Sequence, residues 1–144
     1  MKKRQQRQRG AALVEFALIS SLLFLLLFGI IEVGLILGDQ TQVGQAAREA
    51  ARSAAVGSPI ETAQASAVAA GTGLKLTAAG VYLEKSADGG MTWAALGDTA
   101  SGTNNAATGN LVRATVSYNH PLVTTLIFSG STKLLTSKMV MQRE

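Results

Sequence analysis

The stretch that decides the fold extends from Phe16 to Leu37 and reads FALISSLLFLLLFGIIEVGLIL. Glu32 is its one charged residue. A helix of about 20 apolar residues covers a hydrocarbon core of about 30 Å, so the 22 residues of this run can cross a bilayer. A soluble protein would have to bury the helix on all sides, and the rest of the chain has too little apolar surface to do so. We therefore expect a transmembrane helix.

The charge of the chain is concentrated before this helix. The net charge is +4, from 13 basic and 9 acidic residues. Five of the basic residues precede Gly10, with no acid among them: Lys2, Lys3, Arg4, Arg7 and Arg9. The remaining 8 basic and 9 acidic residues give −1, so the basic pI is no support for nucleic-acid binding. By the positive-inside rule, the N-terminus is cytoplasmic and the C-terminal part lies outside.

A cleaved secretory signal peptide is the competing interpretation of this region. The apolar region of such a peptide has about 7 to 15 residues and is followed by a small-x-small cleavage site. The run here is longer, and Ile36-Leu37-Gly38 does not fit such a site. The sequence therefore favours a membrane anchor.

The composition excludes several kinds of catalytic and metal site. The 144 residues fit one domain of ordinary size. With no cysteine, the chain has no disulfide, thiolate zinc site, iron–sulfur cluster or cysteine nucleophile. The chain also lacks GxSxG, phosphate-loop and HExxH motifs. We expect no enzyme, no metal and no cofactor, and we expect His120 at a surface or hydrogen-bonded position.

Two acidic residues near or within the span differ in what they predict. Glu15 lies at the inner end, where an ionisable group is costly and a functional partner is the expectation. Glu32 follows 17 residues later, about 25 Å along a helix. We expect Glu32 to lie at the outer interface or to serve in helix packing.

The N-terminal segment resembles a known bacterial processing signal. A basic leader ends at Gly10, the fifth residue after it is Glu15, and a long apolar helix follows. This arrangement resembles the class III signal of type IV prepilins. The variant GAALVEFALISSLLFLLLFGIIEVG is similar to TadE-like pseudopilins of the tight-adherence (Tad/Flp) pilus system, as is the stretch AAREAARSAA at 46–55. The segment from Val112 to Tyr118, followed by Pro121-Leu122, is similar to the family's closing strand more loosely.

The resemblance implies proteolytic maturation of the chain. Gly10 would be the last leader residue and Ala11 the first mature residue after cleavage by a membrane-embedded prepilin peptidase. Glu15, with Phe16 beside it, would act in processing and assembly, and the leader bases would hold the site at the cytoplasmic face. The new α-amine of Ala11 would be a cation that Glu15, on the same or a neighbouring chain, can neutralise. Family members often carry proline where this chain has Ser21, so a straighter helix is expected.

Beyond the membrane the helix is expected to continue to residue 56. Small residues form a stripe at spacings of three and four: Val43, Ala46, Ala47, Ala50, Ala51, Ala54 and Ala55. This stripe permits close packing, either in a bundle of subunits or under the chain's own external domain. Gly57 can cap the helix, and Ser58-Pro59-Ile60-Glu61 predicts a second helix with Ser58 as its cap, ending near Ala70.

The remaining sequence predicts strands and turns. Strands are expected around Leu74 and Leu76, at Val81-Tyr82-Leu83, from Leu111 to Tyr118 and from about Thr136 to Gln142, whereas 121–135 has no clear pattern. The octet SADGGMTW at 86–93 predicts a hairpin and resembles a single Asp-box. Its motif residues are expected to be structural: Ser86, Asp88, Gly90, Thr92 and Trp93. Residues 97–110 predict an exposed, mobile loop.

These expectations combine into a pilin-like α+β fold, in which a long N-terminal transmembrane helix extends outward and packs against a small antiparallel sheet. The expected parts are a basic leader at 1–10, a transmembrane helix at 11–37, a helix extension at 38–56 and an external domain at 57–144. The expected protein is a minor pilin or pseudopilin of the bacterial inner membrane, with its C-terminal domain periplasmic or extracellular.

The expected partners are the membrane, the prepilin peptidase, other pilins or pseudopilins and the assembly platform, but no nucleic acid. Whether the subunit enters the pilus stays open. The alternative from a different class is a non-assembling single-pass membrane protein whose external domain binds a partner.

Overall fold

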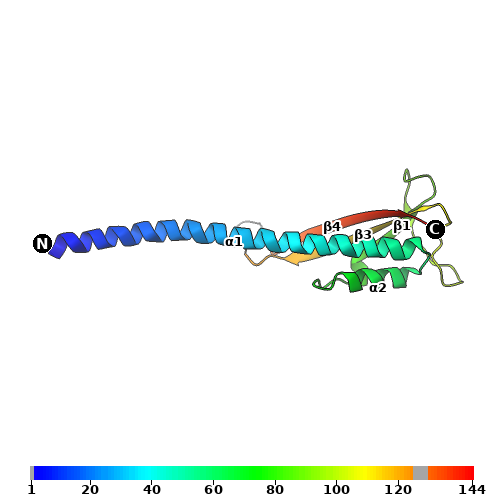
Figure 1. Cartoon of the computed structure of the whole chain (residues 1–144), viewed down its shortest axis with the longest axis horizontal. Helices are drawn as coiled ribbons and strands as arrows, with labels where there is room; N and C mark the ends of the chain where they lie inside the picture. The colour runs from blue at the N-terminus through cyan, green and yellow to red at the C-terminus, as the bar shows by residue number, and fades with distance from the viewer. Residues whose placement is uncertain (1, 125–129) are drawn as a thin grey trace.

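The computed structural model describes residues 2–124 and 130–144, with side chains for these residues except 2–9 and 11. Helix α1 (Lys2–Ala55) runs the length of the molecule, and the rest of the chain gathers around its C-terminal half (Figure 1). Helix α2 (Ile60–Ala70) lies beside α1, and a 3-10 turn, η1 (Ala78–Gly80), leads into the sheet. The α+β class with a long N-terminal helix is confirmed.

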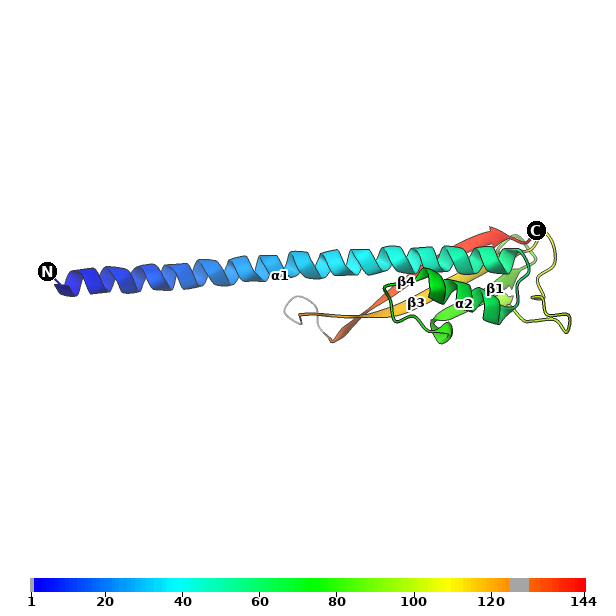
Figure 2. The same cartoon turned by 60° about the horizontal axis from the view of Figure 1, so that its bottom comes forward.

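The sheet has four antiparallel strands in the order β2-β1-β3-β4. These are β1 (Val81–Ser86), β2 (Ala94–Ala95), β3 (Leu111–Pro121) and β4 (Thr132–Gln142). Strand β3 alternates buried and half-buried residues over most of its length, which is typical of a sheet with one covered face. Helices α1 and α2 cover that face (Figure 2).

The core of the domain is built on the small residues of α1. All seven residues of the predicted stripe are buried: Val43, Ala46, Ala47, Ala50, Ala51, Ala54 and Ala55. They pack against Ala63 and Ala67 of α2, and against sheet residues that include Val112, Ala114 and Val116. Alanine allows the backbones of two elements to approach closely, so the sequence stripe serves the chain's own domain, one of the two uses that the pattern left open.

The end of α1 is a Schellman motif. The Ser58 amide donates to the Ser53 carbonyl at 3.2 Å, and the Gly57 amide donates to the Ala54 carbonyl at 3.1 Å. Gly57 has φ +93°, a left-handed conformation that favours glycine. The predicted cap at Gly57 is confirmed.

The predicted cap of α2 was wrong. Pro59 occupies the N-cap position, and its side chain makes no capping hydrogen bond. Instead, the Ile60 amide donates to Asp98 Oδ1 at 2.9 Å. A carboxylate from the distant 97–110 loop thus replaces the local serine, which sequence spacing could not reveal.

The 97–110 loop is less exposed than its composition predicted. Asn104 and Ala106 are buried, and Asp98 forms an isolated bridge with Asn104. The Asn104 Nδ2 group donates to the carbonyls of Ala54 at 2.7 Å and Ser58 at 2.9 Å. The loop therefore supplies the polar partners that the turn between α1 and α2 needs.

Three strand predictions also changed. Leu74 and Leu76 lie outside any strand, although the buried Leu76 joins the core. Strand β3 continues three residues beyond Tyr118, and β4 begins at Thr132, four residues before the predicted start. The pairing of Pro121 with Thr132 accounts for both extensions, because each strand supplies the hydrogen-bond partner of the other.

We predict that Gly57→Ala destabilises the domain by about 1–3 kcal/mol, because an L-residue is strained at this φ. The added Cβ would also collide with the guanidinium of Arg143, which donates to the Ala55 carbonyl. The free energy of unfolding of the full chain in detergent can be followed by fluorescence of Trp93, the one tryptophan. Gly102→Ala is the matched control, since Gly102 has φ +77° with open space around it; equal losses in both variants would contradict the predicted collision.

We further predict that Asn104→Ala destabilises the domain, because it leaves the Ala54 and Ser58 carbonyls without the donor that joins them. Loss of such a buried partner typically costs about 1–3 kcal/mol. The same unfolding measurement on Asn105→Ala provides the control, since the side chain of Asn105 is exposed and accepts one bond, from Gly97. An Asn104 variant no weaker than the Asn105 variant would show that the loop does not support the turn.

Candidate functional site

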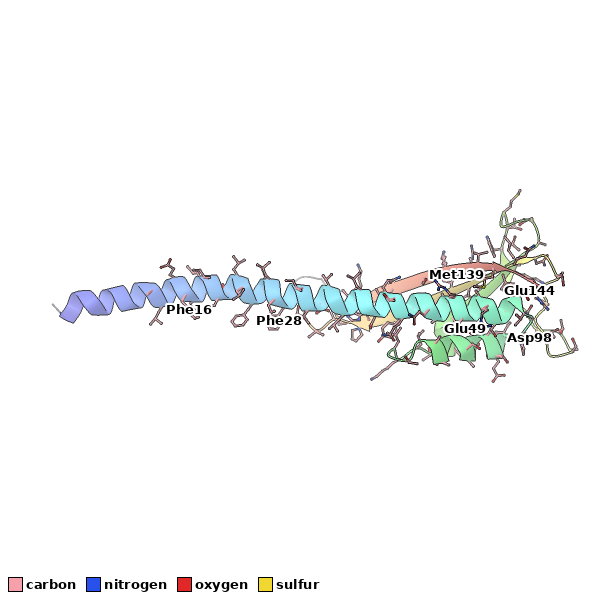
Figure 3. The ribbon with its side chains drawn as sticks, viewed as in Figure 1. Phe16, Phe28, Glu49, Asp98, Met139 and Glu144 are labelled. Carbon is pink, nitrogen blue, oxygen red and sulfur yellow. The ribbon has the colours of Figure 1, made fainter. Side chains whose placement is uncertain are left out.

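The N-terminal half of α1 projects from the domain without contacts. Its large apolar side chains are exposed; Figure 3 shows Phe16 and Phe28 on the bare helix, far from Glu49 and Met139 in the domain. Among the described residues, α1 alone is long and apolar enough to cross a membrane, and none of its most apolar window is buried. Such a surface needs lipid or other helices around it.

The predicted processing residues lie at the start of this free segment. Gly10, Glu15 and Phe16 are exposed, and the backbone of Ala11 continues the same helix. A Cβ on Gly10 would meet nothing within 4 Å, so the fold itself does not require glycine there. Among the side chains that the structure describes, none bonds to Glu15. The leader residues Lys2, Lys3, Arg4, Arg7 and Arg9 lie in the first turns of α1, and their side chains are outside the description.

An apolar groove runs along α1 from Leu25 to Leu37, where the free segment meets the domain. Gly29 and Gly34 open it between larger side chains, among them Leu26, Ile30 and Val33. A Cβ on Gly34 would meet nothing within 4 Å. A helix surface of this shape permits close approach of another helix in a membrane.

A cluster that the sequence did not predict lies where α1 meets the domain. The side chain of Glu32 is fully buried, at 0% exposure. Both of its oxygens accept from the Val123 amide at 3.1 Å, and Oε2 also accepts from the Thr124 amide at 3.0 Å. Glu32 therefore attaches the segment after β3 to α1. The expectation of an interfacial or packing role did not identify this partner, since 91 residues separate it from Glu32.

His120 completes this cluster. It is 4% exposed, and its Nδ1 lies 2.7 Å from Asp39 Oδ2. Its Nε2 lies 3.7 Å from Glu32 Oε1. Both ring nitrogens thus face carboxylates of α1, two helical turns apart. The lone charge in the apolar run was the one sequence signal for this cluster, and it carried no information about His120.

The 86–93 turn has a closed hydrogen-bond network. The Ser86 hydroxyl donates to Asp88 Oδ1 at 2.6 Å, and the Thr92 amide donates to Asp88 Oδ2 at 2.9 Å. These hydrogen bonds, from Ser86 first and then Thr92, hold the pKa of Asp88 well below its usual range. The Gly90 amide donates to the Ser86 hydroxyl, and Trp93 Nε1 donates to the Gly90 carbonyl. Every partner lies within the turn itself, so these residues shape the β1–β2 connection.

The outer face of the sheet carries a further charged contact. Arg113 Cζ lies 4.0 Å from the ring centroid of Trp93, and Arg113 Nη2 lies 2.6 Å from Glu84 Oε2. This contact joins β3 to the hairpin that precedes it. Within 2–124 and 130–144, no group of three or more His, Cys, Asp or Glu side chains is placed to hold a metal ion.

Comparison with known proteins bears on the N-terminal half of the chain. Residues 10–52 match the family model described as TadE-like protein. No curated protein and no solved structure matches the chain. The match begins at Gly10, covers the free segment and most of the alanine stripe, and stops before the sheet. It associates the chain with structural proteins of the Tad pilus, and not with an enzyme family. The resemblance seen in the sequence is confirmed over residues 10–52, and this match is consistent with a TadE-like, pilin-type protein.

Proposed function

We propose that this protein is a minor pilin or pseudopilin that a prepilin peptidase cleaves between Gly10 and Ala11, and that assists assembly of a Tad/Flp-type pilus. The observation that carries the proposal is the TadE-like match, which starts at Gly10 and continues over an unpacked apolar helix. The mature chain is anchored in the inner membrane by this helix. Its domain lies on the periplasmic or extracellular side.

The two halves of α1 differ in their contacts, and this difference supports an assembly role. Its C-terminal half is occupied by its own domain, whereas its N-terminal half has no partner within the described residues. The groove opened by Gly29 and Gly34 adjoins this exposed half. A subunit built in this way can add its helix to a bundle of other pilin helices while its domain stays folded, so packing and not chemistry is its contribution.

Glu15 is placed for a contact between subunits. It lies on the free segment, four residues after Ala11, and no described side chain of its own chain bonds to it. A charged group at the membrane boundary favours an opposite charge. The α-amine created at Ala11 of a neighbouring subunit has that charge. Such a pair would set the axial position of one subunit relative to the next.

A non-assembling membrane protein is the alternative. In that case, the free helix would serve as an anchor alone, and the leader would stay on the chain. The two functions differ at the N-terminus and in the effect of Glu15, and both can be measured.

We predict that the mature protein begins at Ala11 in cells with an active prepilin peptidase. Intact-mass and N-terminal peptide mass spectrometry of the membrane-extracted protein would detect loss of residues 1–10. Gly10→Leu should retain the leader, because the peptidase and not the fold requires glycine at this position.

Gly38→Leu is the matched control for this experiment. Gly38 also lies in α1 with open space at its Cβ position, but far from the cleavage site. Its variant should lose the leader normally. An intact leader on the unmodified chain, or normal maturation of Gly10→Leu, would contradict the proposed site.

We also predict that Glu15→Val leaves the protein in the membrane fraction but lowers pilus assembly, because the apolar helix stays intact and the intersubunit charge pair is lost. Surface pili can be counted by electron microscopy, beside quantitative blots of membrane fractions. Glu61→Val removes an exposed carboxylate from α2 and serves as the control. Unchanged assembly with Glu15→Val would favour the non-assembling anchor.

A further inference from the structure

The end of the β3–β4 hairpin contacts α1 within the apolar run, residues 16–37. The carboxylate of Glu32 accepts from the Val123 and Thr124 amides, and Glu32 lies five residues before Leu37, the end of that run. Five residues correspond to about 7–8 Å along a helix. The described end of the hairpin is therefore beside the apolar run and not beyond it.

A second hydrogen bond independently places the hairpin at this same height along α1. Gln40 Nε2 donates to the Thr136 carbonyl at 3.2 Å, which aligns these two residues. From Thr136 back to Thr132, β4 advances about 13 Å, which equals about nine residues of helix. Because β4 runs obliquely past α1 toward the same end of the molecule (Figure 2), Thr132 lies at the level of the apolar run, at or after Ile31.

The side chains at this level are apolar and exposed. Val123 is 66% exposed and Leu134 is 61% exposed, and Ile30 of α1 is 72% exposed. Among the described residues of this end, 121–124 and 130–134, Lys133 is the one charged residue. The two carboxylates of α1 nearby, Glu32 and Asp39, are engaged with the hairpin amides and with His120.

We propose that the end of the β3–β4 hairpin is a second membrane contact, in which Leu122, Val123 and Leu134 rest in the interfacial layer of the outer leaflet beside α1. The occupant of this surface is lipid, because the surface is continuous with the helix that spans the bilayer. The proposal rests on that span and not on the pilus role.

The polar contacts of Glu32 fit this location. Backbone amides outside a helix or sheet are costly near lipid unless they have partners. Glu32 supplies acceptors for the Val123 and Thr124 amides, and these amides in turn satisfy a carboxylate at the membrane interface. The carboxylate and the amides therefore remove the free-energy cost that each would have near lipid without a hydrogen-bond partner. The same contact in water would have little effect, since solvent would satisfy both groups.

The proposal also moves the outer boundary of the membrane. With the hairpin at the interface, the span covers about 20 residues, roughly 12–31, and not 11–37. The helix from Glu32 onward then belongs to the external domain. Glu15 lies inside the inner boundary by about one turn, where a charged partner has the greatest effect.

The absence of native cysteine allows a direct test in the full chain. Val123→Cys, labelled with an environment-sensitive fluorophore, is reconstituted in phosphatidylcholine vesicles with and without lipids that carry a quencher near the headgroup. We expect blue-shifted emission and strong quenching. Val140→Cys is the matched control: it is an exposed valine of β4 at the far end of the hairpin, and its label should stay unquenched.

Two outcomes would overturn the proposal. One is solvent-like, unquenched emission at the Val123 position. The other is a blue shift without lipid quenching that disappears on dilution with unlabelled chain, which would mean that a second copy covers the surface.

Glu32→Gln tests whether the hydrogen bonds to Glu32 hold the end of the hairpin at the membrane. The amide group offers one acceptor oxygen in place of two, so the label at residue 123 should lose quenching while Trp93 fluorescence stays unchanged. Glu61→Gln is the control. Should Glu32→Gln unfold the domain, Val123→Asp with the label at Leu134→Cys provides the test, since Val123 is exposed and packs in no core. Retained quenching with Val123→Asp would overturn the membrane contact.

Discussion

Close packing of the sheet and α2 against the alanine residues of α1 is the constraint on which the rest of the structure depends. Ala46, Ala50 and Ala54 are fully buried, and a larger side chain at such a position would separate the elements. With no disulfide in the chain, the small sheet domain has no other support of comparable extent. The helix that carries the apolar span is thus also part of the core of the domain.

Polar contacts between distant segments complete this packing at both ends of the domain. At the far end, Asn104 and Asp98 bind backbone groups of the turn between α1 and α2. At the membrane end, Glu32 binds the segment after β3, and His120 bridges to Asp39. These contacts fix how the sheet is placed along α1. In the proposed function, that placement determines how far the domain stands from the bilayer and how much of the helix is available to other subunits.

The division of α1 explains how one helix can serve two purposes. Small residues face the domain in its C-terminal half, and exposed large apolar residues occur along the helix from Leu13 to Leu37. The TadE-like match covers parts of both halves, so the similarity is not confined to the apolar span. The sheet lies outside the match.

The long helix, its apolar span, its alanine stripe and its end at Gly57 could all be read from residue spacing, because each depends on contacts within a few residues. The resemblance over residues 10–56 was accessible because the motifs that carry it are contiguous in the sequence. The cap of α2 by Asp98, the burial of Asn104 and the binding of Glu32 to the Val123 amide were not, since 38, 50 and 91 residues separate the partners. A loop rich in glycine and asparagine has the same composition whether or not it bonds to a helix end. A lone glutamate in an apolar run likewise gives no information about which residue it binds. Only the folded chain brings those groups within hydrogen-bonding distance, and only there does burial make each bond necessary.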